Sequence, residues 1–227
     1  RLEIDFAYEH LTVERERTTI GAGVTLARIA SDAAIALALP ALAEAAATVA
    51  GPGHRTVATL GGNLCLDTRC VFYNQSEWWR RANDCCLKHG GDVCHVAPQG
   101  KRCHAAFSGD LAPVLLVLDA TVEIVGPAGA RGLPLAELYL DDGARHLSLA
   151  PGEIVAAVRI PVQPASARTG YRKARARGAI DFPLAGVAAQ VAMSDGRLRA
   201  LRVALTGTNA RPFLLDGTHA LIGAAVT

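Results

Sequence analysis

The stretch Thr59-Leu60-Gly61-Gly62-Asn63-Leu64-Cys65 separates two kinds of sequence in this 227-residue chain. Before it, apolar runs alternate with turns. After it comes a polar, Cys-rich segment, residues 64–107, which has no sustained period of 2 or 3.6. Two successive glycines before an amide can form a loop whose backbone N–H groups cradle a phosphate or a cofactor. An ordinary tight turn is the simpler interpretation of so short a motif.

The sequence before this loop predicts an α+β layer. Alternating residues at Arg1–Phe6 and Leu11–Glu16 predict the two arms of a strand pair. An Ala-rich helical stretch follows, and Thr25 caps it before Leu26. Ser31-Asp32 and Pro40 interrupt this stretch, and Gly51-Pro52-Gly53 ends it.

The sequence after the Cys-rich segment predicts one buried helix and then mostly strands. Pro113 suits the first turn of a helix over Leu111–Leu118. The strand-rich remainder favours a second, antiparallel domain, so we expect domains at residues 1–163 and 164–227. The expected elements are strands at Thr121–Val125, at Ile154–Pro161 and from Gly170, a turn at Gly126–Gly132, a hairpin of Val187–Met193 and Leu198–Thr206, and a last helix from about His219.

Composition excludes several classes of protein. A hydrophobic fraction of 51% and a charged fraction of 19% exclude a disordered chain. The net charge of +2 is far below that of a typical nucleic-acid-binding domain. The longest uncharged apolar run, Ala33–Ala43, is much shorter than the about 20 residues that a membrane span requires.

All 6 cysteines lie within residues 64–107, and so does the whole surplus of basic residues. A segment of this length without a hydrophobic pattern needs something other than a core to order it. The rest of the chain has no cysteines and needs no disulfides. We therefore expect a metal or cluster site in a protein of the reducing cytoplasm, with a disulfide framework as the alternative.

The spacing of the cysteines leaves the kind of metal site open. Zinc modules usually supply close C-x₂₋₄-C pairs, and only Cys65 and Cys70 approach that pattern. An iron–sulfur cluster also requires four soft ligands, so both remain candidates. The neighbouring His89, His95 and His104 are more simply explained as surface residues or hydrogen-bond donors than as ligands.

Further stretches beside these motifs are distinctive: Asp67–Cys70, Tyr73–Arg80, Cys86–Lys88, Gly91–His95, Arg102-Cys103 and Gly109-Asp110. Together with Thr59–Asn63 they resemble the beta subunit of 4-hydroxybenzoyl-CoA reductase, the flavoprotein subunit of a molybdenum enzyme in the xanthine oxidase family. The resemblance covers essentially the whole chain. Its specific part is the Cys-rich segment, hereafter the insert (residues 64–107), which the wider family lacks.

The resemblance implies an α+β fold, with a partial FAD-binding domain of the molybdenum-hydroxylase flavoprotein type followed by an incomplete antiparallel C-terminal domain of the CO-dehydrogenase flavoprotein type. It further implies that the family's subunit begins with a segment bearing a second Gly-rich FAD loop, for which this sequence has no counterpart.

The resemblance also implies the site residues. A 4Fe–4S cluster in the insert would be held by Cys70, Cys86, Cys94 and Cys103, which leaves Cys65 and Cys85 as non-ligands. Backbone amides would face the pyrophosphate or ribityl oxygens of FAD, a carboxylate would accept from the flavin, and a lysine would place a positive charge near the anionic cofactor. The implied FAD contacts are Val49, Thr59, Leu60, Gly61, Gly62, Asn63, Asp110, Val155 and Lys173, and none of them is catalytic.

The function implied by the resemblance is electron transfer. A ferredoxin would donate electrons to the 4Fe–4S cluster, and FAD would pass them to 2Fe–2S clusters and a molybdenum cofactor on partner subunits, for reductive dehydroxylation of 4-hydroxybenzoyl-CoA to benzoyl-CoA. The flavin subunit of an oxidising molybdenum hydroxylase is one alternative. A zinc- or disulfide-organised interaction module without a redox role is the other.

Overall fold

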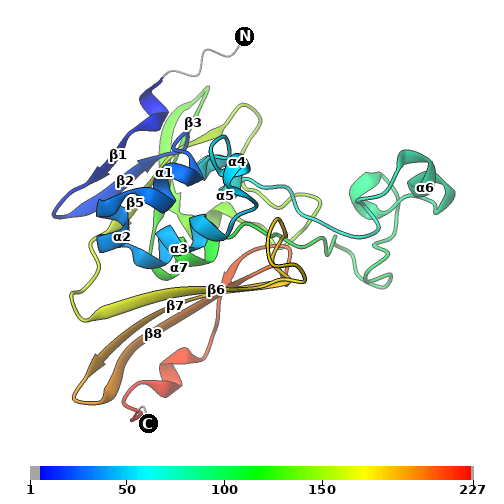
Figure 1. Ribbon diagram of the computed structural model, residues 1–227. Helices are drawn as coiled ribbons and strands as arrows, with labels where there is room; N and C mark the ends of the chain where they lie inside the picture. Colours follow the sequence, from blue (N-terminus) through cyan, green and yellow to red (C-terminus); the bar gives the residue numbers. More distant parts are fainter. Residues whose placement is uncertain (1–5, 226–227) are drawn as a thin grey trace.

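Two antiparallel sheets enclose a layer of helices in the computed structural model, which describes residues 6–225 (Figure 1). The first sheet has the strand order β1-β2-β5-β3-β4. The fold is the α+β arrangement with antiparallel sheets that the sequence predicts. The strands of the first sheet are β1 (Leu11–Val13), β2 (Arg17–Gly21), β3 (Thr121–Gly126), β4 (Gly129–Pro134) and β5 (Ile154–Pro161).

Three short helices follow the first hairpin, and they are separated where the sequence predicts. The last of them ends at Thr48, before the predicted stop, and Pro52 and Gly53 of that stop form the start of a fourth short helix. The Thr25 side chain accepts a hydrogen bond from the backbone N–H of Arg28 and caps α1 (Leu26–Ser31). Asp32 ends α1 and caps α2 (Ala33–Ala38) by accepting from two backbone N–H groups. Pro40 occupies the first turn of α3 (Pro40–Thr48), where its missing N–H is no disadvantage.

Helix α7 (Leu111–Val117) lies at the centre of the molecule, and all seven of its residues are buried. Its N-cap residue, Asp110, makes no side-chain capping bond. The Oδ1 atom of Asn63 does this instead, because it accepts a hydrogen bond from the backbone N–H of Leu111 at 3.1 Å. A residue 48 positions upstream thus caps the central helix.

The second sheet packs against α3 and α7 and has the strand order β6-β7-β8-β9. Its central hairpin turns at Asp195-Gly196, both in the left-handed region, as the Ser194–Arg197 turn signal predicts. The strands are β6 (Ala167–Ala174), β7 (Ala185–Ser194), β8 (Arg197–Thr206) and β9 (Phe213–Leu214).

Some expectations differ from the structure. Strand β1 pairs with β2 rather than with Arg1–Phe6, which lies almost entirely outside the described residues; its last residue opens a 3₁₀ turn, Phe6–Glu9. The expected turn at Gly126–Gly132 is shorter, because β4 already begins at Gly129 and pairs with β3. The expected last helix near His219 is a single 3₁₀ turn, Thr218–Leu221.

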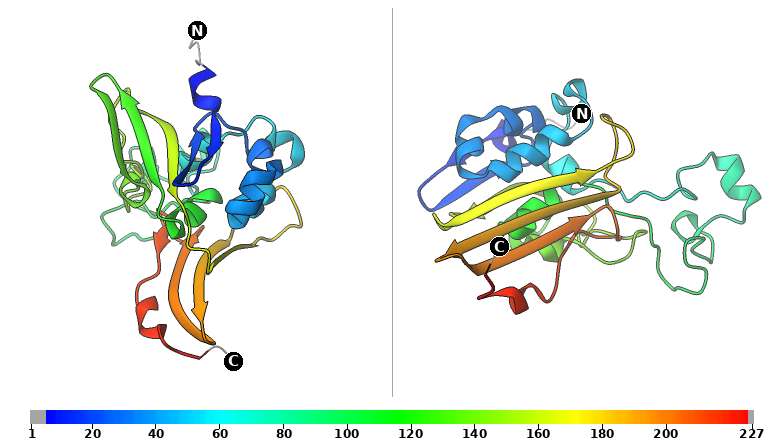
Figure 2. Two further views of the ribbon diagram at one scale, coloured as in Figure 1. Left: turned by 90° about the vertical axis from the view of Figure 1, so that its left-hand side faces the viewer. Right: turned by 60° about the horizontal axis from the view of Figure 1, so that its bottom comes forward.

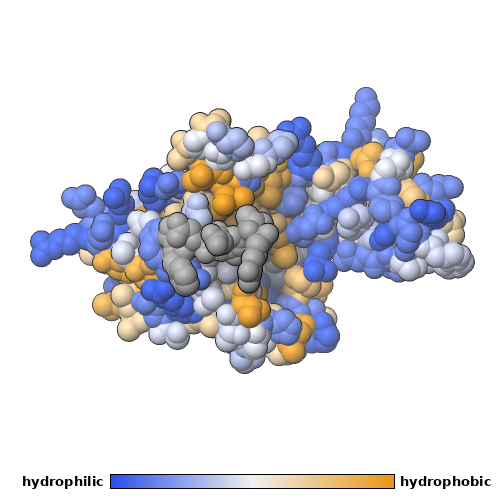
Figure 3. Space-filling view, turned by 90° about the horizontal axis from the view of Figure 1, so that it is seen from above, coloured by the Kyte–Doolittle hydropathy of each residue, from blue (hydrophilic) through white to orange (hydrophobic). Residues whose placement is uncertain are grey.

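The insert forms a lobe that extends away from the body of the molecule (Figures 1 and 2). Its one α-helix is α6 (Glu77–Ala82), capped by Ser76, and a 3₁₀ turn spans Leu87–His89. The face of the lobe seen in Figure 3 is largely hydrophilic. An antiparallel bridge between Arg69 and Ala106 joins the two chain segments that lead into and out of the lobe.

Candidate functional site: a flavin cavity and a cysteine cavity

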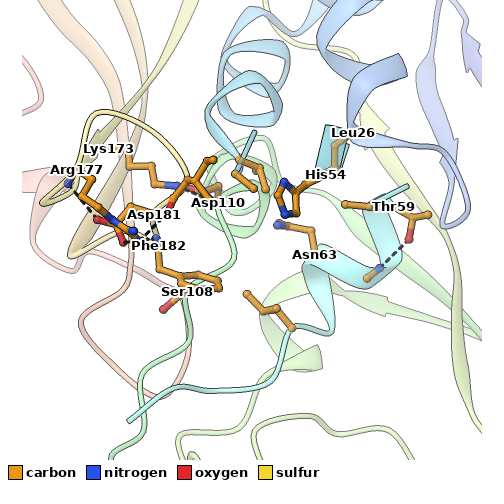
Figure 4. A pocket seen from close by; sticks show the side chains of 16 residues that line it. Leu26, His54, Thr59, Asn63, Ser108, Asp110, Lys173, Arg177, Asp181 and Phe182 are labelled. Carbon is orange, nitrogen blue, oxygen red and sulfur yellow. Dashed lines mark hydrogen bonds and ion pairs between the residues drawn. The ribbon is translucent and has the colours of Figure 1, made fainter. Parts of the chain in front are cut away.

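A cavity of about 430 Å³ opens between two parts of the chain that are distant in sequence. One wall consists of α4 (Pro52–Arg55), α5 (Leu60–Leu64) and the residues next to them, and the opposite wall is the loop between β6 and β7 (Figure 4). The volume lies within the range of about 300–1,000 Å³ that is typical of cofactor and ligand sites. We call this space the flavin cavity.

Six of the nine predicted FAD contacts line the flavin cavity, although they come from five separate elements or loops: Val49, Thr59, Gly62, Asn63, Asp110 and Lys173. The structure does not bring the other three to its surface. Leu60 is fully buried in the core, and Val155 is buried in β5 opposite Ile124. Gly61 packs against Ala22, where an added Cβ would come within 2.8 Å of the Ala22 Cβ.

The Gly-Gly-Asn motif is neither an open loop nor a tight turn, because it forms α5. Neither glycine has a positive φ. The amides of Leu60 and Gly61 donate to the carbonyl oxygens of Val24 and Ala22, both at 2.9 Å. The amides of Gly62 and Asn63 donate to Thr59, one to its side chain and one to its carbonyl. These four amides therefore already have protein acceptors, and the contact of Thr59–Asn63 with FAD stays a prediction.

A buried ion pair forms one end of the flavin cavity. Lys173 Nζ lies 3.1 Å from Asp110 Oδ2, and both side chains are almost completely buried. The hydroxyl of Tyr171 donates to Asp110 Oδ1 at 2.6 Å. Burial raises the pKa of Asp110, while Lys173 and Tyr171 act in the opposite direction. Both oxygens of this carboxylate thus have protein partners, so Asp110 serves to hold Lys173 at the cavity.

The opposite wall contains residues that the sequence did not single out. Arg177, Ile180, Asp181 and Phe182 line the cavity from the β6–β7 loop. The guanidinium of Arg177 bonds the Ile180 carbonyl and the Asp181 carboxylate, which keeps the loop folded on itself. Ile180 has a φ of 51°, which is strained for a β-branched residue and is tolerated mostly at ligand sites and switches.

Across from this loop, His54 lines the cavity from α4, and its side chain and that of Asn63 reach toward the middle of the space (Figure 4). His54 follows directly after the predicted Gly51-Pro52-Gly53 turn. Local sequence signals describe that stretch only as a helix end, so they do not show that the next residue faces a cavity.

Within the insert, the four predicted cluster ligands line one small cavity: Cys70, Cys86, Cys94 and Cys103. All six cysteines of the chain are free thiols, and Cys65 and Cys85 are not part of this lining. Within residues 6–225, no three His, Cys, Asp or Glu side chains are grouped closely enough to hold a single metal ion. In a 4Fe–4S cube each cysteine binds a different iron, so its four thiols stand farther apart than the ligands of one zinc ion.

Backbone N–H groups are aimed at two of these sulfurs. The amide of Ala105 donates to Cys103 Sγ at 3.4 Å, although burial still raises the pKa of this thiol. Burial acts in the same direction on Cys94, but three backbone N–H groups outweigh it and lower the pKa of this thiol. By contrast, burial raises the pKa of the Cys65 thiol to about 11, which disfavours a thiolate there.

The donor set of this cavity suits an iron–sulfur cluster. Four thiols and N–H groups aimed at sulfur are what such a cluster requires. His95 also lines the cavity, and its Nε2 atom is buried without a hydrogen-bond partner in the described structure, so a donor or acceptor is available there. The cavity measures about 10 Å³, so the thiols would have to move apart around a cluster. The segment that carries these thiols consists mostly of turns, with one short α-helix, α6, so its backbone can adjust to a cluster.

Comparisons with known proteins agree with this fold. The family described as "FAD binding domain in molybdopterin dehydrogenase" matches residues 8–163. The aldehyde oxidoreductase FAD-binding subunit PaoB of Escherichia coli strain K12 is 34% identical over 175 residues, which cover 73% of this chain and 54% of that protein. The putative xanthine dehydrogenase FAD-binding subunit XdhB of the same strain is 30% identical over 186 residues, which cover 82% of this chain and 50% of that protein.

The solved structure of a Cu,Mo-CO dehydrogenase in its cyanide-inactivated form has the same fold, with a TM-score of 0.73. It is 24% identical, and the alignment covers 96% of this chain and 63% of the other. The chain spans about half the length of the curated relatives that it matches. Within the described residues, no helix is both long and apolar enough to span a membrane. Because the family match extends over residues 8–163 and the relatives are up to 34% identical, this chain belongs to the family of FAD-binding domains of molybdopterin dehydrogenases.

Proposed function

We propose that this chain is the electron-transfer part of a flavoprotein subunit that carries both FAD and a 4Fe–4S cluster. The observation that carries the proposal is the convergence of Cys70, Cys86, Cys94 and Cys103 on one cavity, while Cys65 and Cys85 stay outside it. Bound FAD would accept and release electrons singly or in pairs, and the bound cluster would transfer them singly. The chain's own residues hold the two groups and exclude water from them.

The connection between the two cavities supports this function. Arg69 and Ala106 exchange two backbone hydrogen bonds, each 2.7 Å long, in the two-stranded stalk that joins the insert to the body. Cys70 and Cys103 lie at the insert end of this stalk, while Leu66 and Ser108 at its other end line the flavin cavity. Electron transfer requires that two redox groups lie close together, and this doubly hydrogen-bonded stalk joins the chain segments that line the two cavities.

In the flavin cavity, Lys173 and the β6–β7 loop would hold the cofactor. Lys173 presents a positive charge to an anionic ligand, and Asp110 fixes its position. Phe182 and Ile180 offer apolar surface to a ring system. We further propose that electrons pass from a ferredoxin to the cluster and FAD, and on to 2Fe–2S and molybdenum subunits. The proposed reaction is the reductive dehydroxylation of 4-hydroxybenzoyl-CoA, a proposal that rests on the motif resemblance.

The alternative is the flavin subunit of an oxidising molybdenum hydroxylase. The names of two relatives, an aldehyde oxidoreductase and a putative xanthine dehydrogenase, favour it. Turnover of the assembled enzyme separates the two: reductive dehydroxylation of 4-hydroxybenzoyl-CoA by reduced ferredoxin supports the first proposal, whereas oxidation of aldehydes or purines without that activity supports the alternative. A zinc-organised module is disfavoured by the absence of a single-ion ligand group in the described residues.

The cluster assignment is tested with matched cysteine variants in the full-length subunit. We expect Cys94→Ser and Cys86→Ser to lose iron and acid-labile sulfide together with the low-potential EPR signal, while the FAD absorbance remains. Cys85→Ser changes a thiol next to Cys86 but outside the cavity, so this variant should keep the iron, the sulfide and the EPR signal. Unchanged iron and sulfide in Cys94→Ser would refute the ligand set, and zinc without sulfide in the unaltered protein would favour the interaction module.

A further inference from the structure

A buried lysine lies against the cysteine cavity. The side chain of Lys88 is only 7% exposed and lines the cavity together with the four cysteines. Its Nζ donates to Asp67 Oδ1 at 2.6 Å, to the hydroxyl of Thr68 and to the Thr68 carbonyl at 3.2 Å. Lysines are seldom buried, because removing an ammonium group from water is costly unless its charge is compensated.

The counter-charge of Lys88 faces water rather than the cavity. The Asp67 side chain is 63% exposed, so solvent screens much of its charge. His146 Nδ1 lies 3.9 Å from the same Asp67 oxygen, and burial lowers the pKa of His146, which keeps its ring neutral at neutral pH. Tyr73 presents its ring face to Nζ at 4.8 Å and adds no charge. Lys88 is also the single Lys or Arg among the described residues that line the cavity, so it supplies the positive charge there.

We propose that Lys88 sets the reduction potential of the iron–sulfur cluster by placing a buried positive charge against its thiolate shell. This inference rests on the proposed function, because it requires the cluster. A cube held by four thiolates is negatively charged, and reduction adds one more negative charge. A fixed cation stabilises the reduced form more than the oxidised form, so it raises the potential.

A purely structural role for Lys88 is the rival explanation. The hydroxyl of Thr68 that receives the lysine also donates to the carbonyl oxygen of Gly143, so the lysine contributes to the attachment of the insert to the body. A structural role predicts loss of cluster or of stability when Lys88 is replaced. It does not predict a shift of potential in a protein that keeps its full iron content.

The test is an EPR-monitored redox titration of the full-length subunit, with iron and sulfide content measured on each sample. We expect Lys88→Met to reduce the equilibrium constant for one-electron reduction of the cluster at least tenfold, which corresponds to a fall of about 59 mV. The control is Lys101→Met, which removes the same charge from an exposed position in the insert outside the cavity lining. It should shift the equilibrium constant less than twofold.

A second variant changes the potential in the opposite direction. Asp67→Asn keeps a hydrogen-bond acceptor for Lys88 but removes the opposing charge. Because the Asp67 side chain is largely exposed, the fold should tolerate this change. Because solvent screens part of the Asp67 charge, we expect this variant to raise the equilibrium constant for reduction by a smaller factor than Lys88→Met lowers it. General damage to the fold would not produce an increase. Equal potentials in all four proteins, each with full iron content, would overturn the inference about Lys88 alone, whereas an unaltered protein without iron and sulfide would overturn the proposed function as well.

Discussion

The guanidinium carbon of Arg69 lies 3.8 Å from the centroid of the Phe182 ring. Arg69 is the residue before Cys70 at the root of the insert, and Phe182 lines the flavin cavity from the β6–β7 loop. This cation–π contact joins the lobe that carries the cysteines to the loop that closes the flavin cavity. The two proposed redox sites therefore share one structural contact in addition to the backbone stalk.

We expect Arg69→Gln and Phe182→Leu each to weaken FAD binding about two- to fivefold, because an exposed cation–π contact is worth about 0.5–1 kcal/mol. Flavin fluorescence titration of the apo full-length subunit measures this. Arg15→Gln, at an exposed position remote from the cavity lining, is the control. Since both changes break the same contact, the double variant should be weaker by less than the product of the two single effects. Fully multiplicative effects would show that the contact does not hold the loop.

Loss of the long-range cap on α7 should destabilise the whole domain. We expect Asn63→Ala to lower the free energy of unfolding by about 1 kcal/mol, within the usual range of about 0.5–2 kcal/mol for a lost N-cap, because the buried Leu111 amide loses its acceptor. Urea denaturation measures the change. Asn74→Ala, an exposed position in the insert, should leave the stability unaltered. An unfolding free energy of Asn63→Ala equal to that of the unaltered protein would contradict this role.

Gly61 is required for close packing rather than for a left-handed backbone. We expect Gly61→Ala to destabilise the protein by about 1–3 kcal/mol, because its Cβ would overlap the Cβ of Ala22. Gly53→Ala is the matched control in α4, where an added Cβ meets nothing within 4 Å. It should be neutral or stabilising by about 0.4–1 kcal/mol. Thermal unfolding of both variants checks the prediction, and equal melting temperatures would disprove it.

The insert should respond to acid through Glu77. Hydrogen bonds from Arg80 and Arg81 lower the pKa of Glu77 from 4.5 to about 2. Because the folded state favours the charged form, this stabilisation is complete above pH 4.5 and is lost as the pH falls from about 4.5 toward 2. The two tryptophans of the chain, Trp78 and Trp79, both lie in α6, so their fluorescence reports on this helix.

We expect an acid transition of this fluorescence in the unaltered protein that is absent from Glu77→Gln. The control is Glu153→Gln, because Glu153 also has a pKa lowered to about 2, by Arg131, but lies in the body of the molecule. It should keep the transition. A transition that persists unchanged in Glu77→Gln would contradict the assignment.

Much of the local structure could be predicted because the signals are themselves local. Thr25, Asp32 and Pro40 determine where three successive helices begin, and Asp195-Gly196 marks the hairpin of the second sheet. The helical conformation of the Gly-Gly-Asn motif was not predicted, because α5 depends on partners outside the motif. The backbone amides of Leu60 and Gly61 donate to the carbonyl oxygens of Val24 and Ala22. No pattern within residues 59–63 records that contact.

The sequence alone predicted most of the helices and strands in their order, since capping residues, turn residues and periodicity are local signals. The choice of four among the six cysteines, and of Asp110 and Lys173 for the cofactor, came from the resemblance of the motifs, because spacing by itself leaves those choices open. The tertiary structure decided that Asn63 caps α7, that the β6–β7 loop closes the flavin cavity, and that Lys88 is buried beside the thiols. These contacts join residues that are tens of positions apart along the chain. Their free energy comes from desolvation and packing, which arise only when the folded chain brings such residues together.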